Sequence, residues 1–74
     1  MSKAVAIAVR AASRYYKFDA THCGHQVGFR YAIEGNDREI TIRVTPPDKK
    51  RPVLTLRLAR PDMRIIASRT TAQS

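Results

Sequence analysis

Apolar residues occupy every second position in four separate stretches of this chain. In chain order these sets are Val27, Phe29, Tyr31 and Ile33; Ile40, Ile42 and Val44; Leu54, Leu56 and Leu58; and Met63, Ile65 and Ala67. Because successive side chains of a strand point to opposite faces of a sheet, a period of two is typical of strands buried on one face. The pattern predicts four β-strands, of which the last is the weakest.

A short turn sequence separates the first two of these strands. It contains Gly35-Asn36, and both residue types accept the positive φ angles of a tight hairpin turn. Pairing that keeps both apolar sets on one face requires an even number of loop residues, either two or four. With a two-residue loop, Phe29 is expected opposite Ile42 and Tyr31 opposite Ile40.

The third and fourth strands are joined by Arg60-Pro61-Asp62-Met63. Proline at the second position of a turn has its φ already fixed, so this turn is expected to align Leu58 with Ile65. The connection between the two hairpins is different, because residues 46–52 contain three prolines and three successive cations. We interpret this connection as a stiff basic loop.

The N-terminal segment permits two interpretations. Val5, Ala8, Val9, Ala12 and Tyr16 recur at helical spacing, whereas residues 5, 7 and 9 also alternate as in a strand. Five alanines between residues 4 and 12 favour a helix, since alanine is the strongest helix former. The sequence therefore predicts an α+β fold, with an N-terminal helix packed on a four-stranded antiparallel sheet built from two hairpins. The alternative is an all-β, small barrel-like sheet.

The length of 74 residues corresponds to one small domain, near the lower limit for folding on a single core. We assign residues 1–68 to this domain. Residues 69–74 are polar and without periodicity, so they are expected to form a flexible tail. A chain of this size leaves no room for a large buried active site.

Charge narrows the possible functions. Fourteen Lys and Arg against six Asp and Glu give a formal net charge of +8, and ten of the fourteen cations are arginine. The planar guanidinium group is suited to bidentate contacts with phosphate or carboxylate groups. The partner of this protein is therefore expected to be negatively charged.

The expected environment is the cytoplasm. Cys23 is the only cysteine, so an intrachain disulfide is impossible and a secreted disulfide scaffold is excluded. The apolar run from residue 4 to residue 9 is too short for a signal-peptide core or a membrane span. We therefore expect no membrane association.

The strand pattern places several arginines on the polar side of the sheet, where neighbouring strands lie about 4.8 Å apart. Cations also occur in the basic loop and along one side of the predicted helix, next to an aromatic residue. Basic groups interleaved with aromatic rings are typical of nucleic-acid binding surfaces. The candidate contacts are Arg30, Arg43, Arg57 and Arg64 on the sheet; Lys49, Lys50 and Arg51 in the loop; and Arg10, Arg14, Lys17 and Tyr15 in the N-terminal segment.

Phe29 and Tyr31 are spaced by two, as are the aromatic pairs of some RNA-binding sheets. They share a face with Val27 and Ile33, however, so we assign them to the core. Tyr16 is also assigned to the core, since on a helix it lies on the same side as Val9.

His22, Cys23 and His25 are weak candidates for metal ligands. Their spacing matches no standard zinc signature, and adjacent His22 and Cys23 point poorly at one ion. We expect a connecting loop and no cofactor. The chain has no glycine-rich phosphate loop and no Ser-His-Asp arrangement, and Glu34 and Glu39 flank a turn, where solvent is close. We therefore expect a protein that is not an enzyme.

Three functional hypotheses follow. The first is a small basic module that binds RNA or DNA, contacting phosphates through the arginine-rich sheet face. The second is a small regulator of the phage or mobile-element type, which docks on a nucleic-acid machine such as RNA polymerase through protein contacts. The third is a small ribonuclease in which Arg, Tyr and His act on a phosphodiester. The sequence is compatible with either RNA or DNA as the ligand and with any oligomeric state.

Overall fold

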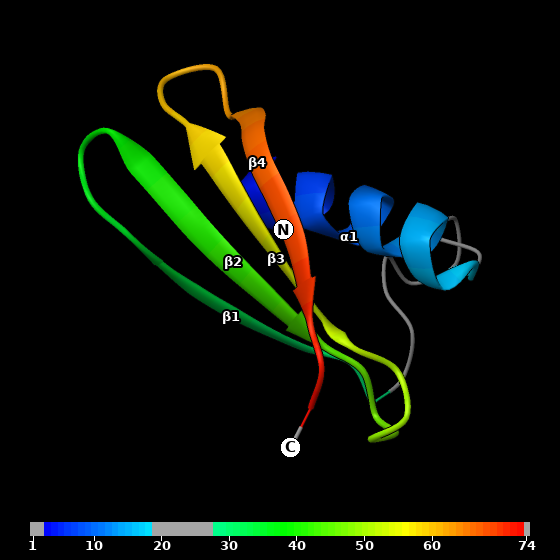
Figure 1. Cartoon of the computed structure of the whole chain (residues 1–74). Helices are drawn as coiled ribbons and strands as arrows, with labels where there is room; N and C mark the ends of the chain where they lie inside the picture. The colour runs from blue at the N-terminus through cyan, green and yellow to red at the C-terminus, as the bar shows by residue number, and fades with distance from the viewer. Residues whose placement is uncertain (1–2, 19–27, 74) are drawn as a thin grey trace.

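The computed structural model describes residues 3–18 and 28–73, which form one helix and four strands. The elements are α1 (Lys3–Tyr16), β1 (Arg30–Gly35), β2 (Glu39–Thr45), β3 (Val53–Ala59) and β4 (Arg64–Thr71). The strands form one antiparallel sheet in the order β1-β2-β3-β4, and α1 lies on one side of it (Figure 1). This confirms the predicted α+β fold, and the all-β alternative is wrong.

Small side chains bring α1 close to the sheet. Ala4, Ala8, Val9, Ala12 and Tyr16 are the buried residues of the helix. Ala4, Ala8, Ala12 and Tyr16 are four residues apart and Val9 lies beside Ala8, so the five form one face, which packs on β2 and β3. Three of these five are alanines, which favour the helix and fill little space between it and the strands.

The helix ends at a left-handed residue. Lys17 has a φ of 62°, and the amide of Phe18 donates to the carbonyl of Ser13 at 3.1 Å. This is the Schellman arrangement, which satisfies one of the last carbonyls of a helix. It turns Phe18 back towards the sheet, where its ring lies 5.1 Å from the ring of Phe29.

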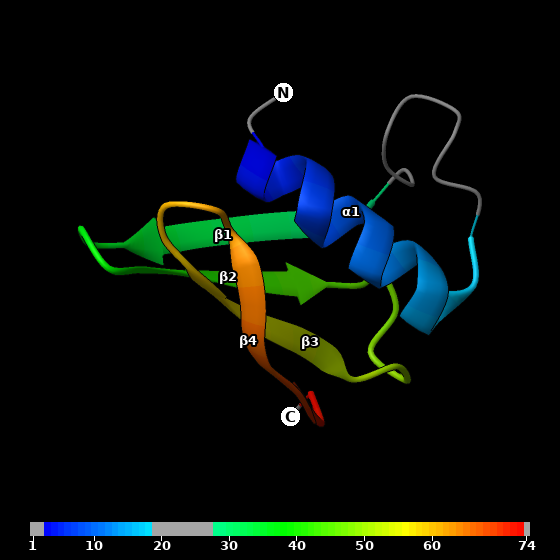
Figure 2. The same ribbon diagram turned by 90° about the horizontal axis from the view of Figure 1, so that it is seen from above.

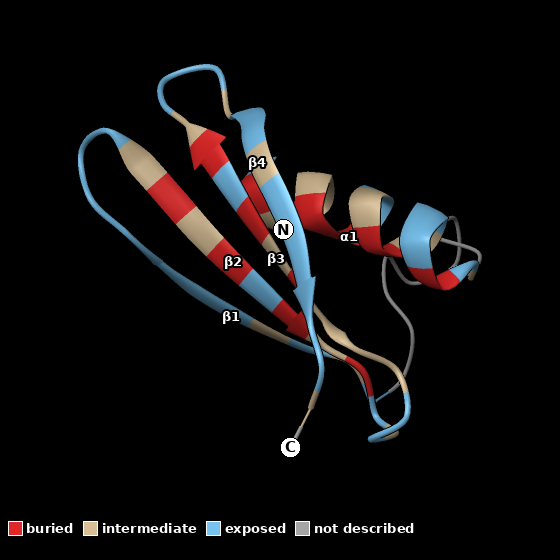
Figure 3. Ribbon diagram, in the orientation of Figure 1, coloured by how far each residue is buried: buried red, intermediate tan, exposed pale blue. Residues whose placement is uncertain are grey.

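The hydrophobic core lies between α1 and the two central strands. The alternation of buried and exposed residues along β2 and β3 is visible in Figure 3, whereas β1 and β4 at the sheet edges are mostly exposed. The buried strand residues are Ile40, Ile42, Val44, Leu54, Leu56 and Leu58. Phe29 and Tyr31 pack against this cluster, as the sequence predicts.

The first hairpin keeps the predicted face but not the predicted register. Tyr31 lies opposite Val44, and Ile33 lies opposite Ile42. The expected pairs of Tyr31 with Ile40 and of Phe29 with Ile42 are therefore wrong, displaced by four residues along β2. An even displacement preserves which side chains point to the core, so the error does not change the assignment of faces.

The turn between β1 and β2 explains why their register differs from the predicted one. Its two central residues are Asp37 and Arg38, because the amide of Asn36 donates to the carbonyl of Glu39 at 2.9 Å. The side-chain oxygen of Asn36 accepts from the amides of Arg38 and Glu39 at 2.8 and 3.0 Å. Neither Gly35 nor Asn36 has a positive φ. Asn36 therefore shapes the turn through its side chain. The two turn residues, Asp37 and Arg38, lie two positions later in the chain than the sequence pattern suggests.

The second hairpin contains a bulge. Leu58 lies opposite Ile65, as predicted, but the register shifts between Arg57 and Leu58. Beyond this shift Ala67 lies opposite Arg57, and Ser68 lies opposite Leu56. The prediction that Ala67 shares the apolar face with Ile65 is therefore wrong, since an extra residue in one strand reverses the faces that follow it.

The last strand is longer than the sequence indicates. β4 continues through Arg69 to Thr71, which lies opposite Val53. Gln73 follows, and its side-chain amide donates to the carbonyls of Asp48 and Arg51, both at 2.8 Å. The flexible tail expected from residue 69 onwards is wrong for residues 69–71, which pair with β3.

Candidate nucleic-acid interface

One face of the sheet is not covered by α1 (Figure 2). We call it the outer face. Strand pairing assigns fifteen positions to it: Arg30, Ala32 and Glu34 of β1; Glu39, Thr41, Arg43 and Thr45 of β2; Val53, Thr55, Arg57 and Ala59 of β3; and Arg64, Ala67, Arg69 and Thr71 of β4. These positions carry five arginines and two glutamates, so the outer face is cationic.

The outer-face arginines come from all four strands, and all five are exposed. Arg43, Thr55 and Arg69 lie in one row across β2, β3 and β4. At about 4.8 Å between strands, the backbones of Arg43 and Arg69 are about 10 Å apart. Arg57 lies in the neighbouring row, between Thr41 and Ala67. The arginines thus form a band across the sheet.

The predicted residues Arg30, Arg43, Arg57 and Arg64 all lie on this face, as the alternation indicates. Sequence reasoning missed the fifth, Arg69, because residues from 69 onwards were assigned to a tail. A signal was present in the run Arg69-Thr70-Thr71, since threonine is a strand-forming residue. The bulge before it could not be read from the pattern.

Two outer-face arginines have acidic partners. Arg57 donates from Nη2 to Oε1 and Oε2 of Glu39 at 2.6 and 2.8 Å, and from Nε to Oε2 at 3.2 Å. These hydrogen bonds, and then the charge of Glu39, raise the pKa of Arg57. Arg43 makes a looser contact, with its Nη2 3.9 Å from Oε1 of Glu34.

The other three outer-face arginines are more available to a partner. Within residues 3–18 and 28–73, no carboxylate forms an ion pair with Arg30, Arg64 or Arg69. Their guanidinium groups can therefore contact phosphate without first breaking a described ion pair.

A shallow hollow of about 460 Å³ lies on the outer face near Arg57 and Arg69. Hydroxyl and guanidinium groups together are suited to the oxygens of a phosphate group. The residues that line the hollow are Thr41, Thr55, Arg57, Ala67, Ser68 and Arg69.

The basic loop does not present its three cations alike. Lys49 and Lys50 are exposed, but Arg51 is only half exposed. Its guanidinium lies over the rings of Tyr16 and Phe29, 5.5 and 5.4 Å from their centres. It also donates to Asp48, with Nη2 2.6 Å and Nε 2.7 Å from Oδ1. Arg51 thus holds the loop to the core, and its predicted contact with nucleic acid stays a prediction.

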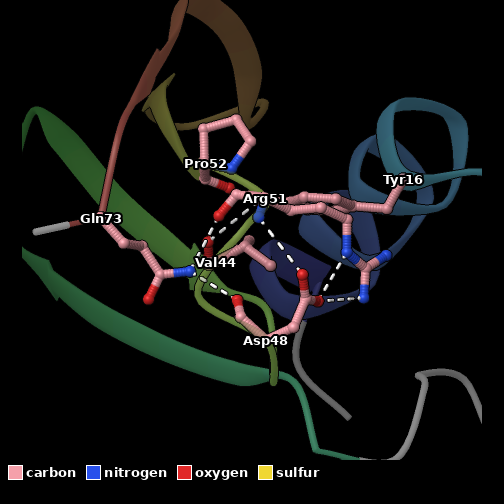
Figure 4. Close-up of polar contacts among 6 residues, drawn as sticks. All are labelled: Tyr16, Val44, Asp48, Arg51, Pro52 and Gln73. Atoms are coloured by element: carbon pink, nitrogen blue, oxygen red, sulfur yellow. Dashed lines mark hydrogen bonds and ion pairs between the residues drawn. The ribbon is translucent and has the colours of Figure 1, made fainter.

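The same loop is held from two further sides (Figure 4). The hydroxyl of Tyr16 donates to the carbonyl of Pro52 at 2.6 Å, and Gln73 binds the carbonyls of Asp48 and Arg51. Burial raises the pKa of Tyr16. The hydrogen bond from Arg51 lowers the pKa of Asp48. The loop is therefore fixed to both α1 and the end of the chain.

The predicted helix cations form a separate surface. Arg10, Arg14 and Lys17 are exposed on or just after α1, which lies on the other side of the sheet from the outer face. Tyr15 is 44% exposed, and its ring packs edge-on against Tyr16 at 4.8 Å. The structure does not bring these four residues together with the arginine band.

The metal hypothesis cannot be placed in the structure, because His22, Cys23 and His25 lie outside the described residues. In residues 3–18 and 28–73 there is no group of three or more His, Cys, Asp or Glu suited to a metal ion.

Across the described part of the chain, no helix is both long and apolar enough to cross a membrane. No protein-family model, curated protein or solved structure matches this chain.

Proposed function

We propose that this protein binds nucleic acid in the cytoplasm, through contacts between its outer face and backbone phosphates. The observation that carries the proposal is the gathering of Arg30, Arg43, Arg57, Arg64 and Arg69 on a sheet face that no described element covers. A regular array of guanidinium groups complements the regular negative charge of a nucleic-acid backbone.

The side chains between the arginines support a contact with phosphates over a contact with bases. The outer face contains threonine, alanine and valine but no aromatic residue in the described strands. Phe29 and Tyr31 point to the core instead, so they provide no platform on which unpaired bases could stack. Phosphate contacts carry no sequence information of their own, so binding is expected to be independent of sequence.

The distribution of acidic residues sets the strength of this binding. Glu34 and Glu39 lie on the outer face and partly neutralise Arg43 and Arg57. The three arginines without a described carboxylate partner are Arg30, Arg64 and Arg69. They are expected to supply most of the affinity, and the two ion pairs to limit it.

The test is the salt dependence of binding to labelled DNA and RNA, measured by fluorescence anisotropy between about 50 and 200 mM salt. Three to five neutralised phosphates predict a log-log slope between about −3 and −5 for a duplex. Two duplexes of different sequence are expected to bind with affinities within about twofold of each other. A slope near zero would remove the proposal.

A further inference from the structure

A second surface lies on the helix side of the sheet, between α1 and the edge strand β4. It is a groove of about 340 Å³, which we call the α1–β4 groove. The apolar part of its lining is Ala11, Leu54, Leu56 and Ile65, and Tyr15 and Arg14 stand at its helix side. Tyr15 is 44% exposed and Ile65 is 38% exposed.

The groove exists because α1 covers only the centre of the sheet. The helix packs on β2 and β3, so the inner face of β4 is left open. Ile66, beside Ile65 at the bulge, is also exposed, by 43%. Several large apolar side chains exposed next to one another are typical of a surface that binds a partner.

The charges around the groove indicate the charge of the partner that it binds. The three elements that line it, α1, β3 and β4, contain no Asp or Glu. Arg14 lines the groove, and Arg10 is exposed one turn earlier on the same helix. The described acidic residues lie on β1, β2 and the connecting turns. A partner with apolar anchors among acidic residues complements this surface.

Two other occupants fit less well. A nucleobase carries polar ring atoms around its whole edge that need hydrogen-bond partners, and most of the lining is aliphatic, so only Arg14, Tyr15 and Ser68 offer side-chain partners. A second copy of this chain would bring two cationic helices together on a protein with a net charge of +8. A hydrocarbon side chain flanked by carboxylates buries no unpaired polar atom and brings no like charges together.

We infer that the α1–β4 groove binds an acidic segment of a partner protein, which inserts an aliphatic or aromatic side chain between α1 and β4. The partner surface and the outer face lie on opposite sides of the sheet. The protein can then hold a protein and a nucleic acid at once. The inference does not depend on the proposed function, since it rests on the groove alone.

The experiment uses a short synthetic peptide of glutamates with leucine and phenylalanine at helical spacing, added to the isotope-labelled full chain without nucleic acid. Amide chemical shifts are expected to change at Ala11, Arg14, Tyr15, Ile65 and Ser68, which line the groove. A peptide with serine in place of leucine and phenylalanine is expected to bind at least about tenfold more weakly. A peptide with lysine in place of glutamate is expected not to bind.

The chain offers a matched pair of control variants. Ile65 and Ile33 are both exposed isoleucines on the inner face of the sheet, on β4 and β1, but only Ile65 lines the groove. Ile65→Ala is expected to weaken peptide binding about fivefold or more, and Ile33→Ala less than about twofold. Arg14→Gln is expected to weaken it several-fold through lost charge.

Three results would overturn the inference. Equal binding of the serine peptide would show attraction by charge alone. Changes in the groove amides on adding a short oligonucleotide, but not the acidic peptide, would identify a nucleic-acid site. A dimer in sedimentation that Ile65→Ala dissociates would identify a second copy as the occupant.

Discussion

Arg57 of β3 and Glu39 of β2 form the closest ion pair on the outer face, with Nη2 of Arg57 2.6 Å from Oε1 of Glu39. They are diagonal neighbours, since Arg57 lies opposite Thr41 and Glu39 lies opposite Ala59. The pair fixes one guanidinium group in the middle of the arginine band and adds a negative charge to it. It therefore opposes the binding of phosphate at its own position.

Replacing this carboxylate is expected to strengthen nucleic-acid binding. Glu39→Gln removes a negative charge and frees Arg57, so the affinity for duplex DNA should rise about two- to fivefold at low salt. The thermal midpoint should change by no more than a few degrees, because the pair is exposed. Anisotropy titrations and thermal melts measure both quantities.

Glu34→Gln is the matched control for this variant. It removes the same charge, but the Glu34 carboxylate lies 3.9 Å from Nη2 of Arg43 and makes no close hydrogen bond with any residue that the structure describes. Its gain in affinity should therefore be smaller than that of Glu39→Gln. A loss of affinity in Glu39→Gln would show that the ordered ion pair itself is needed for binding.

The face of each central strand could be predicted from the sequence, because alternation reports burial directly. The positions of Arg43 and Arg57 follow from it without any knowledge of register. Register itself depended on the side chain of Asn36, which binds two amides and moves the turn to Asp37 and Arg38. These hydrogen bonds cannot be predicted from the alternation of apolar and polar residues.

The position of Arg69 and the role of Arg51 could not be predicted for a related reason. Arg69 reaches the outer face only because a bulge reverses the alternation in β4. Arg51 binds Asp48 three residues earlier but also lies over rings from α1 and from the segment before β1. Contacts between distant segments are set by tertiary packing, on which a local pattern carries no information.

Tyr16→Phe tests the link between the helix and the basic loop. The Tyr16 hydroxyl donates to the carbonyl of Pro52 at 2.6 Å, and its loss should cost about 1 kcal/mol. For a domain of this size the thermal midpoint should fall by about 4–8 °C. Tyr15→Phe, at the exposed neighbouring position, should leave it unchanged. Equal midpoints for both variants would mean that the Tyr16 hydrogen bond adds nothing to stability.

Asp48 should contribute to the acid sensitivity of the fold. Its hydrogen bond from Arg51 lowers its pKa, so the ionised carboxylate stabilises the folded state above the unfolded pKa of about 3.9. This contribution is lost as the pH falls through the lower pKa of the folded state.

Thermal melts between about pH 5 and pH 2 measure this effect. Asp48→Asn should show a shallower decline of the thermal midpoint than the wild type. Parallel curves for the wild type and Asp48→Asn would contradict the assigned role of Asp48.

Gly35→Ala should destabilise the first hairpin. A Cβ at Gly35 would lie 2.6 Å from the carbonyl oxygen of Glu39, which is backbone and cannot move aside alone. The expected cost is about 1–3 kcal/mol. The sign is informative, since Gly→Ala stabilises a protein where the space is free. A thermal midpoint equal to or above that of the wild type would show that the turn is looser than described.

The central claim is that the outer face, and not the cationic helix, binds the phosphates. It is tested most directly by comparing two triple variants that each lose three positive charges: Arg30→Gln, Arg64→Gln and Arg69→Gln on the outer face, and Arg10→Gln, Arg14→Gln and Lys17→Gln on or next to α1. Salt-dependent affinities for one DNA duplex are the measurement.

The outer-face triple should weaken binding by about thirtyfold or more at moderate salt and reduce the steepness of the log-log salt slope by about 3. The helix triple should weaken binding less than about threefold, because its charges lie on the other side of the sheet. Equal losses in the two variants, or a larger loss in the helix triple, would contradict the account.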